Sequence, residues 1–231
     1  MTDYLLFIDS EASGLPKRWD VPYSKEGNWP HAVQIAWVIS TKDGEEVKQE
    51  NHYIKDDDFQ ISHSATKIHG ITRELVNSKG ESRNKVMTLL ANDLHQYQPL
   101  VIGHFIELDF HIAAAEFYRA GLDNTLQQLD RFCIMMATDH LVVNPARKYL
   151  KLADLYRILF NAELENPHDA IVDARATATC FFELLKRGEI NEDKITQQKM
   201  SLLNPVAASS NSGCSMLFLF FMLILLITIL L

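Results

Sequence analysis

Cysteine is scarce in this sequence, and the cysteines that are present follow no metal-binding or disulfide pattern. The three of them, Cys133, Cys180 and Cys214, are odd in number and form no CxxC spacing. This excludes a disulfide framework and a cysteine-based zinc site, and it favours a reducing compartment. The N-terminal segment has no basic region and too few consecutive apolar residues for a signal peptide.

Charge is absent from the C-terminal end. All 22 lysines and arginines and all 30 acidic residues lie at or before Lys199, and the net charge is -8. From Met216 to Leu231 only Thr228 is not apolar. As a helix, this run with Ser212–Ser215 would extend about 30 Å, the thickness of a bilayer core. We expect a transmembrane helix at 216–231; a buried core helix and a partner-binding helix are the alternatives.

The position of this run predicts the domain organisation. A transmembrane run that ends the sequence would be a single-pass C-terminal tail anchor, with the membrane as a binding partner. Basic residues upstream and no charge downstream favour a cytoplasmic catalytic domain. We expect one folded domain at residues 1–187, a linker at 188–215 and the anchor at 216–231.

Apolar patterning predicts a mixed α/β fold. The continuous run at 4–8 is typical of a strand buried on both faces, and the alternation at 33–40 with the segment 46–54 predicts an antiparallel hairpin beside it. Short apolar runs predict two later strands, at 100–103 and 131–134. Helices are expected at 62–68, 82–97, 108–120, 152–160 and 169–186. Strands that first meander and then alternate with helices indicate a mixed five-stranded sheet flanked by helices.

Four acids and a histidine occur at the ends of these elements. Asp9 and Glu11 are two residues apart on the first strand, so they point to the same face, ~6.5 to 7 Å apart along it. Asp109 falls in the first turn of a helix that follows a buried strand. His168 precedes a helix that Asp169 can cap, and Asp173 lies one turn inside it. Each acid alone is more typical of a helix end or of a solvated side chain, but together they form a candidate site for a hard cation.

Three motifs carry a family resemblance. The segments FIDSEASGL, GHFIELD and HDAIVDA resemble the exonuclease motifs of the DnaQ-like (DEDDh) 3′–5′ exonucleases, a group that includes the proofreading epsilon subunit of bacterial DNA polymerase III. The resemblance extends from about Tyr4 to Leu185. It implies a ribonuclease-H-like fold, an exonuclease domain at 1–187, and release of nucleoside 5′-monophosphates. It also implies a metal-ligand set for two Mg²⁺ or Mn²⁺ ions, with His168 as general base; the ligands are Asp9, Glu11, Asp109 and Asp173.

The same resemblance implies substrate-binding positions. Ala12, Ser13 and Leu15 match positions that hold the terminal nucleotide, with Leu15 as an apolar wedge under a base. His69 matches a position beside that pocket, and His104 is expected to position the second-motif loop. Family members often have Thr-Thr in place of Ala12-Ser13, and Asn in place of Phe105. The segment 16–29 is longer than a tight turn needs, and it contains three aromatic residues, Trp19, Tyr23 and Trp29. These residues could stack on bases, although packing of the loop is the default interpretation.

The expected function is therefore a membrane-tethered, metal-dependent exonuclease that acts on single-stranded or frayed DNA with a free 3′ end. An acidic chain is unusual for a nucleic-acid partner, but two divalent ions in the cleft would offset that charge. The alternatives are an exoribonuclease that trims RNA ends and an inactive module that binds nucleic acid. No small-molecule organic cofactor is expected, and no protein partner is indicated.

Overall fold

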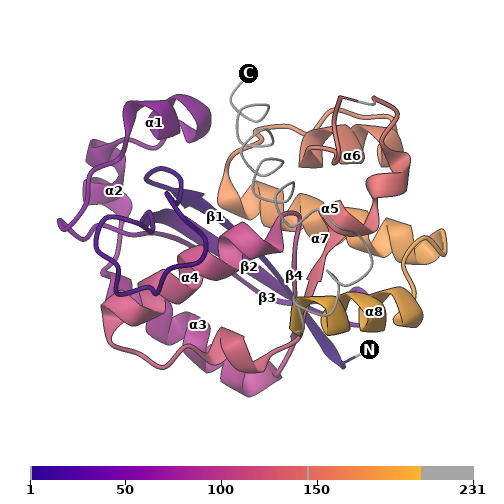
Figure 1. Ribbon diagram of the computed structural model, residues 1–231, viewed down its shortest axis with the longest axis horizontal. Helices are drawn as coiled ribbons and strands as arrows, with labels where there is room; N and C mark the ends of the chain where they lie inside the picture. Colours follow the sequence, from indigo (N-terminus) through magenta and orange to yellow (C-terminus); the bar gives the residue numbers. More distant parts are fainter. Residues whose placement is uncertain (1, 145, 204–231) are drawn as a thin grey trace.

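A mixed sheet forms the centre of the molecule. The structure, a computed structural model, describes residues 2–144 and 146–203. Its five-stranded sheet has the order β3-β2-β1-β4-β5 (Figure 1). Strands β1, β2 and β3 are antiparallel neighbours, whereas β4 runs parallel to β1, and β5 parallel to β4. The strands are β1 (Tyr4–Ala12), β2 (Ala32–Thr41), β3 (Glu46–Tyr53), β4 (Leu100–Gly103) and β5 (Arg131–Cys133). The predicted mixed α/β sheet is confirmed.

Helices cover both faces of the sheet. The helices between β3 and β5 are α1 (His63–His69), α2 (Arg73–Lys79), α3 (Arg83–Tyr97), α4 (Ile106–Ala120) and the short 3₁₀ helix η1 (Thr125–Gln128). Those after β5 are α5 (Ile134–Ala137), the 3₁₀ helix η2 (Asp139–Leu141), α6 (Leu152–Phe160), α7 (Ala170–Lys186) and α8 (Glu192–Leu203). Sequence patterning missed α2, α8 and the short helices α5, η1 and η2.

The alternation of side chains along β1 divides the core into two. Leu6 and Ile8 belong to the core that packs against α3 and α4, and Leu5 and Phe7 belong to the core that packs against α6 and α7. All four are almost completely buried, as a central strand between two layers of helices requires. In β2, the side that was expected to be more polar is buried as well, because α7 packs over both β1 and β2.

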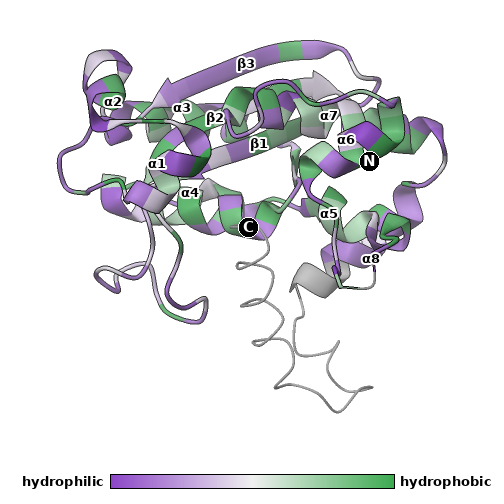
Figure 2. Cartoon of the chain, turned by 90° about the horizontal axis from the view of Figure 1, so that it is seen from above, coloured by the Kyte–Doolittle hydropathy of each residue, from purple (hydrophilic) through white to green (hydrophobic). Residues whose placement is uncertain are grey.

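Strand β3 forms a polar edge to the sheet. It is largely hydrophilic (Figure 2), and most of its side chains are exposed or half-buried. A polar edge strand discourages pairing with another chain.

The expected transmembrane helix is the part of the fold prediction that was wrong. Within residues 2–144 and 146–203, no helix is long and apolar enough to cross a bilayer. The segment to which that expectation was assigned, 216–231, lies outside the described residues, as does most of the second half of the predicted linker.

Helix α8 lies inside the segment that was expected to be a linker. Gln198 on α8 binds both backbone groups of Cys133 on β5: its Oε1 accepts the N–H at 2.5 Å and its Nε2 donates to the carbonyl at 3.1 Å. Ile190 and Ile195 are buried in the same core as Phe132. The folded part of the chain therefore extends past residue 187. The signal was weak in the sequence because, among residues 192–199 of α8, Ile195 alone is buried.

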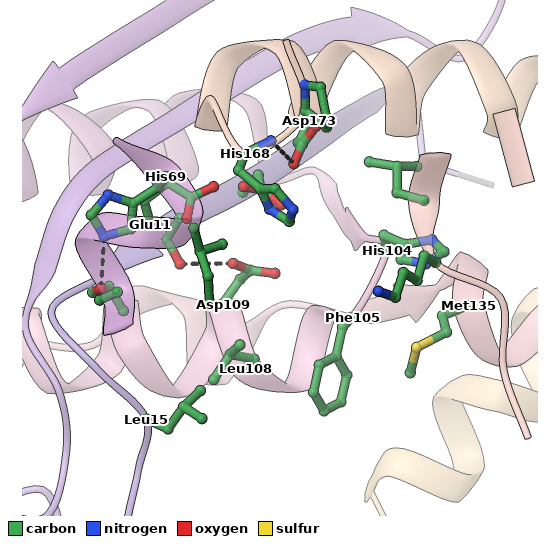
Figure 3. A pocket seen from close by; sticks show the side chains of 18 of the residues that line it. Glu11, Leu15, His69, His104, Phe105, Leu108, Asp109, Met135, His168 and Asp173 are labelled. Carbon is green, nitrogen blue, oxygen red and sulfur yellow. Dashed lines mark hydrogen bonds between the residues drawn. The ribbon is translucent and has the colours of Figure 1, made fainter. Parts of the chain in front are cut away.

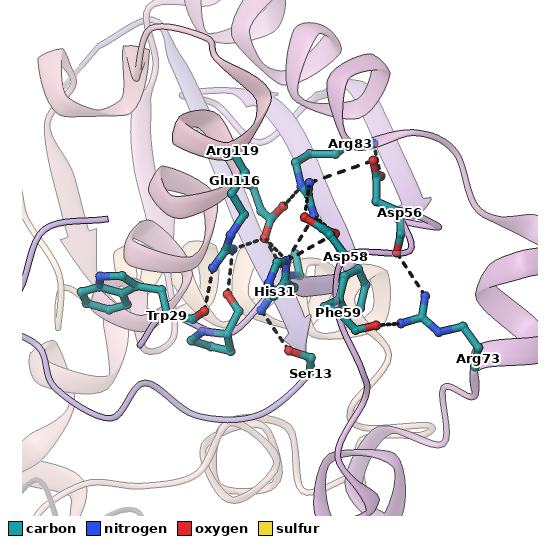
Figure 4. A network of polar contacts seen from close by, with 12 residues as sticks. Ser13, Trp29, His31, Asp56, Asp58, Phe59, Arg73, Arg83, Glu116 and Arg119 are labelled. Carbon is teal, nitrogen blue, oxygen red and sulfur yellow. Dashed lines mark hydrogen bonds and ion pairs between the residues drawn. The ribbon is translucent and has the colours of Figure 1, made fainter. Parts of the chain in front are cut away.

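Glu116 ties the segment that follows β1 to the helices behind the sheet (Figure 4). Its side chain is fully buried, and its carboxylate oxygens lie 2.5 Å from Arg83 Nε and 2.5 Å from Arg119 Nη1. The same carboxylate accepts the backbone N–H of Ala32 at 3.1 Å. Arg119 also donates to the carbonyl of Trp29 at 2.6 Å. These contacts fix the end of the segment 13–31, which connects β1 to β2 and is called the excursion below.

Arg83 extends this network to the start of the excursion. It donates two hydrogen bonds to Asp58, at 2.7 and 2.8 Å, and one to Nδ1 of His31 at 3.1 Å. The backbone N–H of His31 donates to Ser13 Oγ at 2.9 Å. Burial, together with the charges of Arg119 and Arg83, lowers the pKa of His31 to about 4, so this histidine is neutral near pH 7. Both ends of the excursion are thus held by one polar network.

Removing Glu116 should destabilise the fold strongly. Glu116→Ala leaves two guanidinium groups without their buried partner, and we expect a loss of about 3–5 kcal/mol in the free energy of unfolding. Urea denaturation followed by circular dichroism measures this loss, with Glu165→Ala, at an exposed glutamate, as the control. Equal losses in the two variants would contradict the role of Glu116 in the network.

Candidate active site

Four carboxylates from three elements converge at one edge of the sheet, and Figure 3 shows three of them, those of Glu11, Asp109 and Asp173. Strands β1 and β4 are parallel, so their carboxyl ends lie at the same edge. Asp9 and Glu11 come from the end of β1, Asp109 from the first turn of α4 directly after β4, and Asp173 from the first turn of α7. All four line one cavity of about 600 Å³. The structure thus brings together the acids that the sequence singled out.

His168 completes this group from the loop before α7. Its backbone has a φ of +68°, a left-handed conformation that is uncommon for a residue other than glycine. Its N–H donates to Asp173 Oδ2 at 3.1 Å, which holds the loop in that conformation. The imidazole is exposed, and Glu11, His168 and Asp173 each offer one ligand atom within 4.8 Å of the others. Strain of this kind is typical of functional sites.

A buried glutamine fixes the start of α7 against the sheet. Gln34 lies on β2 and is 1% exposed. Its Oε1 accepts the N–H of Ala170 at 3.2 Å, and its Nε2 donates to Asp169 Oδ1 at 2.8 Å. Asp169 caps α7, as predicted, by accepting the N–H of Ile171. Sequence reasoning missed Gln34; the only signal was a polar residue inside an otherwise apolar strand.

The electrostatics of the site are dominated by burial and by repulsion between like charges. Burial, followed by the charges of the neighbouring acids, raises the pKa of Asp9 well above its usual value and that of Glu11 to about 9. Burial also raises the pKa of Asp109 to about 7, although Ser10 Oγ donates to Asp109 Oδ1 at 2.7 Å and opposes the rise. For Asp173, burial raises the pKa to about 6.

This site has the properties of a divalent-cation site. Among the described residues, no lysine or arginine forms an ion pair with any of the four carboxylates. The Oδ1 atom of Asp173 is buried and has no hydrogen-bond partner in that part of the chain. Buried carboxylates without a counter-charge are costly, and carboxylate oxygens are the ligands that Mg²⁺ and Mn²⁺ prefer. The donor set therefore fits divalent metal ions.

The predicted substrate-binding residues separate into two groups. Ala12, Leu15, His69 and His104 line the cavity, and Leu15 is 43% exposed. Ser13 does not line it, because its side chain is buried and its Oγ accepts the N–H of His31. Ser13 therefore holds the excursion in place and does not face the cavity.

The two histidines hold segments of the cavity wall. Nδ1 of His69 accepts the N–H of Ile71 at 3.0 Å, so its Nε2 carries the proton and donates to the carbonyl of Ala12 at 3.3 Å. Nε2 of His104 donates to the carbonyl of Leu150 at 2.9 Å. Burial lowers the pKa of His69, and it lowers that of His104 to about 4, so both are neutral near pH 7. His104, in the GHFIELD segment, thus binds the chain just before α6 through Leu150.

The side of the cavity opposite His168 and Asp173 is apolar. Figure 3 shows Leu15, Leu108 and Phe105 there, with Met135 beyond Phe105. Trp19 lines the same cavity. The arrangement offers carboxylates to a phosphate group and its metal ions on one side, and apolar surface to a base on the other.

The sequence matches an enzyme family over most of the described chain. The sequence model of the RNase_T family, described as exonuclease, matches residues 6–181. The chain belongs to this exonuclease family. It is therefore a nuclease, a hydrolase of phosphodiester bonds. None of the curated proteins matches the sequence significantly.

Solved structures share the fold of this exonuclease. Exonuclease I of E. coli in complex with a dT13 oligonucleotide superposes with a TM-score of 0.66 at 21% identity, over 80% of this chain and 41% of that chain. The zinc-bound complex of the same enzyme with single-stranded DNA gives 0.65 at 19% identity, over 85% and 42%. A 3′-exonuclease that recognises the 3′ end of a histone mRNA stem-loop gives 0.62 at 14% identity, over 81% and 83%. This chain thus spans about two fifths of exonuclease I.

The raised pKa values predict how the stability of the metal-free exonuclease depends on pH. Carboxyl groups whose folded-state pKa exceeds the unfolded value of about 4 bind more protons when folded, so stability falls as pH rises above that value. The fall should continue towards the pKa of Glu11, about 9. In EDTA we expect the Tm to fall between about pH 5 and about pH 8, and Mg²⁺ to restore most of it at the higher pH.

The variant Asp173→Asn removes one of the repelling charges, so its Tm in EDTA near pH 8 should exceed that of the wild type and respond less to Mg²⁺. Asp123→Asn, at an exposed carboxylate, is the matched control and should behave as wild type. Differential scanning calorimetry measures each value. A Tm in EDTA that is flat or rises across this pH range would contradict the assigned electrostatics.

Proposed function

We propose that this protein is a 3′–5′ exonuclease that hydrolyses the terminal phosphodiester bond of single-stranded or frayed DNA and releases nucleoside 5′-monophosphates. The observation that carries the proposal is the convergence of four carboxylates and His168 in one cavity: Glu11, Asp109 and Asp173 are buried, Asp9 is half-buried, and none of the four has a lysine or arginine partner among the described residues. Membership of the exonuclease family supports the reaction class.

The four carboxylates would hold the metal ions. Asp9, Glu11, Asp109 and Asp173 supply only oxygen ligands, which suits two Mg²⁺ or Mn²⁺ ions. When bound, such ions stabilise the charge that develops on phosphate oxygens and lower the pKa of a coordinated water. The role of Ser10 is to orient Asp109 through its hydrogen bond.

His168 is the proposed general base. Partial desolvation by the surrounding chain, together with the charge of Lys151, lowers the pKa of its imidazole. His168 is therefore neutral near pH 7 and able to accept a proton from the attacking water. The hydrogen bond from its backbone N–H to Asp173 holds the loop, and the imidazole therefore stays beside Glu11 and Asp173.

The apolar side of the cavity supports a nucleotide as substrate. Leu15 would lie under the terminal base, opposite the carboxylates that face the phosphate. DNA is favoured over RNA because the two side chains that follow Glu11 offer no hydrogen bond to a ribose 2′-hydroxyl: Ala12 is apolar, and the Ser13 side chain is buried and does not line the cavity.

The test is digestion of a 5′-labelled oligonucleotide in Mg²⁺. We expect a ladder that shortens from the 3′ end, with nucleoside 5′-monophosphates as products by chromatography. Asp9→Asn should abolish activity, and His168→Ala should lower kcat by about 10²- to 10⁴-fold, the contribution of a positioned base. Asp123→Asn is the control.

Matched DNA and RNA oligonucleotides, digested in parallel, separate the two substrate classes. Faster digestion of RNA would identify an exoribonuclease instead. Activity that survives Asp9→Asn or excess EDTA would contradict the metal-dependent mechanism, and binding without hydrolysis would indicate an inactive module.

A further inference from the structure

The excursion between β1 and β2 carries three aromatic residues, and the structure gives them different environments. Trp29 is 3% exposed, and its Nε1 donates to the carbonyl of Val21 at 3.2 Å. Its ring stacks on His111 of α4, with centroids 4.8 Å apart. The hydroxyl of Tyr23 forms a hydrogen bond with Nδ1 of His111, at an oxygen–nitrogen distance of 2.9 Å. Trp29 and Tyr23 therefore pack the loop, as the default interpretation of the sequence expected.

Trp19 differs from both of them. It is half-buried, lines the cavity that contains the carboxylates, and makes no hydrogen bond through its indole N–H within the described part of the chain. Its ring stands nearly perpendicular to those of Trp29, at 6.0 Å and 86°, and His111, at 5.7 Å and 76°. Packing of the loop explains the positions of Trp29 and Tyr23, but Trp19 is only partly covered by it and also lines the cavity.

The rings that contact Trp19 are themselves held in place by polar contacts. His111 is bonded through Nε2 to Glu107 at 3.0 Å, and Glu107 also pairs with Arg131 at 3.5 Å. At its carbonyl end, Trp29 is held by Arg119. An aromatic ring that is fixed before binding loses little entropy when it contacts a ligand.

Phe105 extends this surface towards the reacting side. It directly precedes α4, lines the same cavity, and its ring centroid lies 6.2 Å from that of Trp19. Figure 3 shows Phe105 on the apolar side of the cavity, the side that also carries Leu15 and Leu108. The apolar surface thus continues from Leu15 and Leu108 to the aromatic rings of Phe105 and Trp19.

We infer that Trp19 and Phe105 form a stacking surface for the base next to the terminal one, which makes Trp19 a determinant of single-strand specificity. The inference rests on the proposed nuclease function. The terminal base is assigned to Leu15, and the preceding base continues away from the carboxylates along the same wall. Stacking is indifferent to base identity but needs an unpaired, unstacked base, so a paired end is excluded.

The test compares substrates that do and do not contain that base. On a short single-stranded oligonucleotide, Trp19→Ala should raise KM about 10-fold with little change in kcat, the effect of losing one base–aromatic stack. On the p-nitrophenyl ester of thymidine 5′-monophosphate, which has a single base, its kcat/KM should equal that of wild type. Trp19→Phe should restore most of the affinity, and Tyr118→Ala, at an exposed aromatic residue of α4, should have no effect.

A second arm uses the wild-type protein alone. An oligonucleotide that lacks the base next to the 3′-terminal nucleotide should show the same rise in KM, and Trp19→Ala should lose nothing further on it. If the missing base has no effect on wild type, or if Trp19→Ala impairs the single-base ester as much as the oligonucleotide, the inference is overturned. Failure of wild type to hydrolyse either substrate would instead overturn the proposed function, and the inference with it.

Discussion

The burial of like charges at one edge of the sheet is the constraint around which this molecule is organised. Four carboxylates that have no cationic partner in the described chain repel one another, and burial raises the pKa values of all four. An apolar core alone would not keep them together. They stay close because each belongs to an element whose position is fixed elsewhere: Asp9 and Glu11 to the central strand, Asp109 to the helix after β4, and Asp173 to α7.

Polar contacts away from the carboxylates keep these elements in place. From inside the sheet, Gln34 forms hydrogen bonds with Asp169 and with the backbone N–H of Ala170 at the start of α7. Glu116 connects α3, α4 and the excursion through its bonds to Arg83 and Arg119. Such buried groups contribute more to position than to stability, because much of their attraction is offset by desolvation. The network around Glu116 also supports the cavity, since the excursion it anchors carries Leu15 and Trp19.

The cavity divides recognition between its two sides. In the proposed function, the carboxylates and His168 face the phosphate, whereas Leu15, Phe105 and Trp19, which line the same cavity, face the bases. Such a division lets the reacting side serve any nucleotide, while the apolar side determines how many unpaired bases are needed. If the stacking surface that we infer is correct, the excursion between β1 and β2 contributes to strand specificity through Trp19.

The sequence by itself determined the strands and most helices, and it singled out the four acids and the histidine that the structure brings together, because hydrophobic periodicity and motif spacing are local properties. It could not show which of Ser13 and Trp19 faces the cavity, because both lie in one loop and differ in what packs against them. The hydroxyl of Ser13 accepts the backbone N–H of His31, whereas Trp19 lines the cavity. Nor could it reveal Gln34, or the bonds of Glu116 to Arg83 and Ala32, because these partners are distant in the chain. Local pattern specifies elements, but the pairing of buried polar groups depends on how those elements pack, and only the tertiary structure decides it.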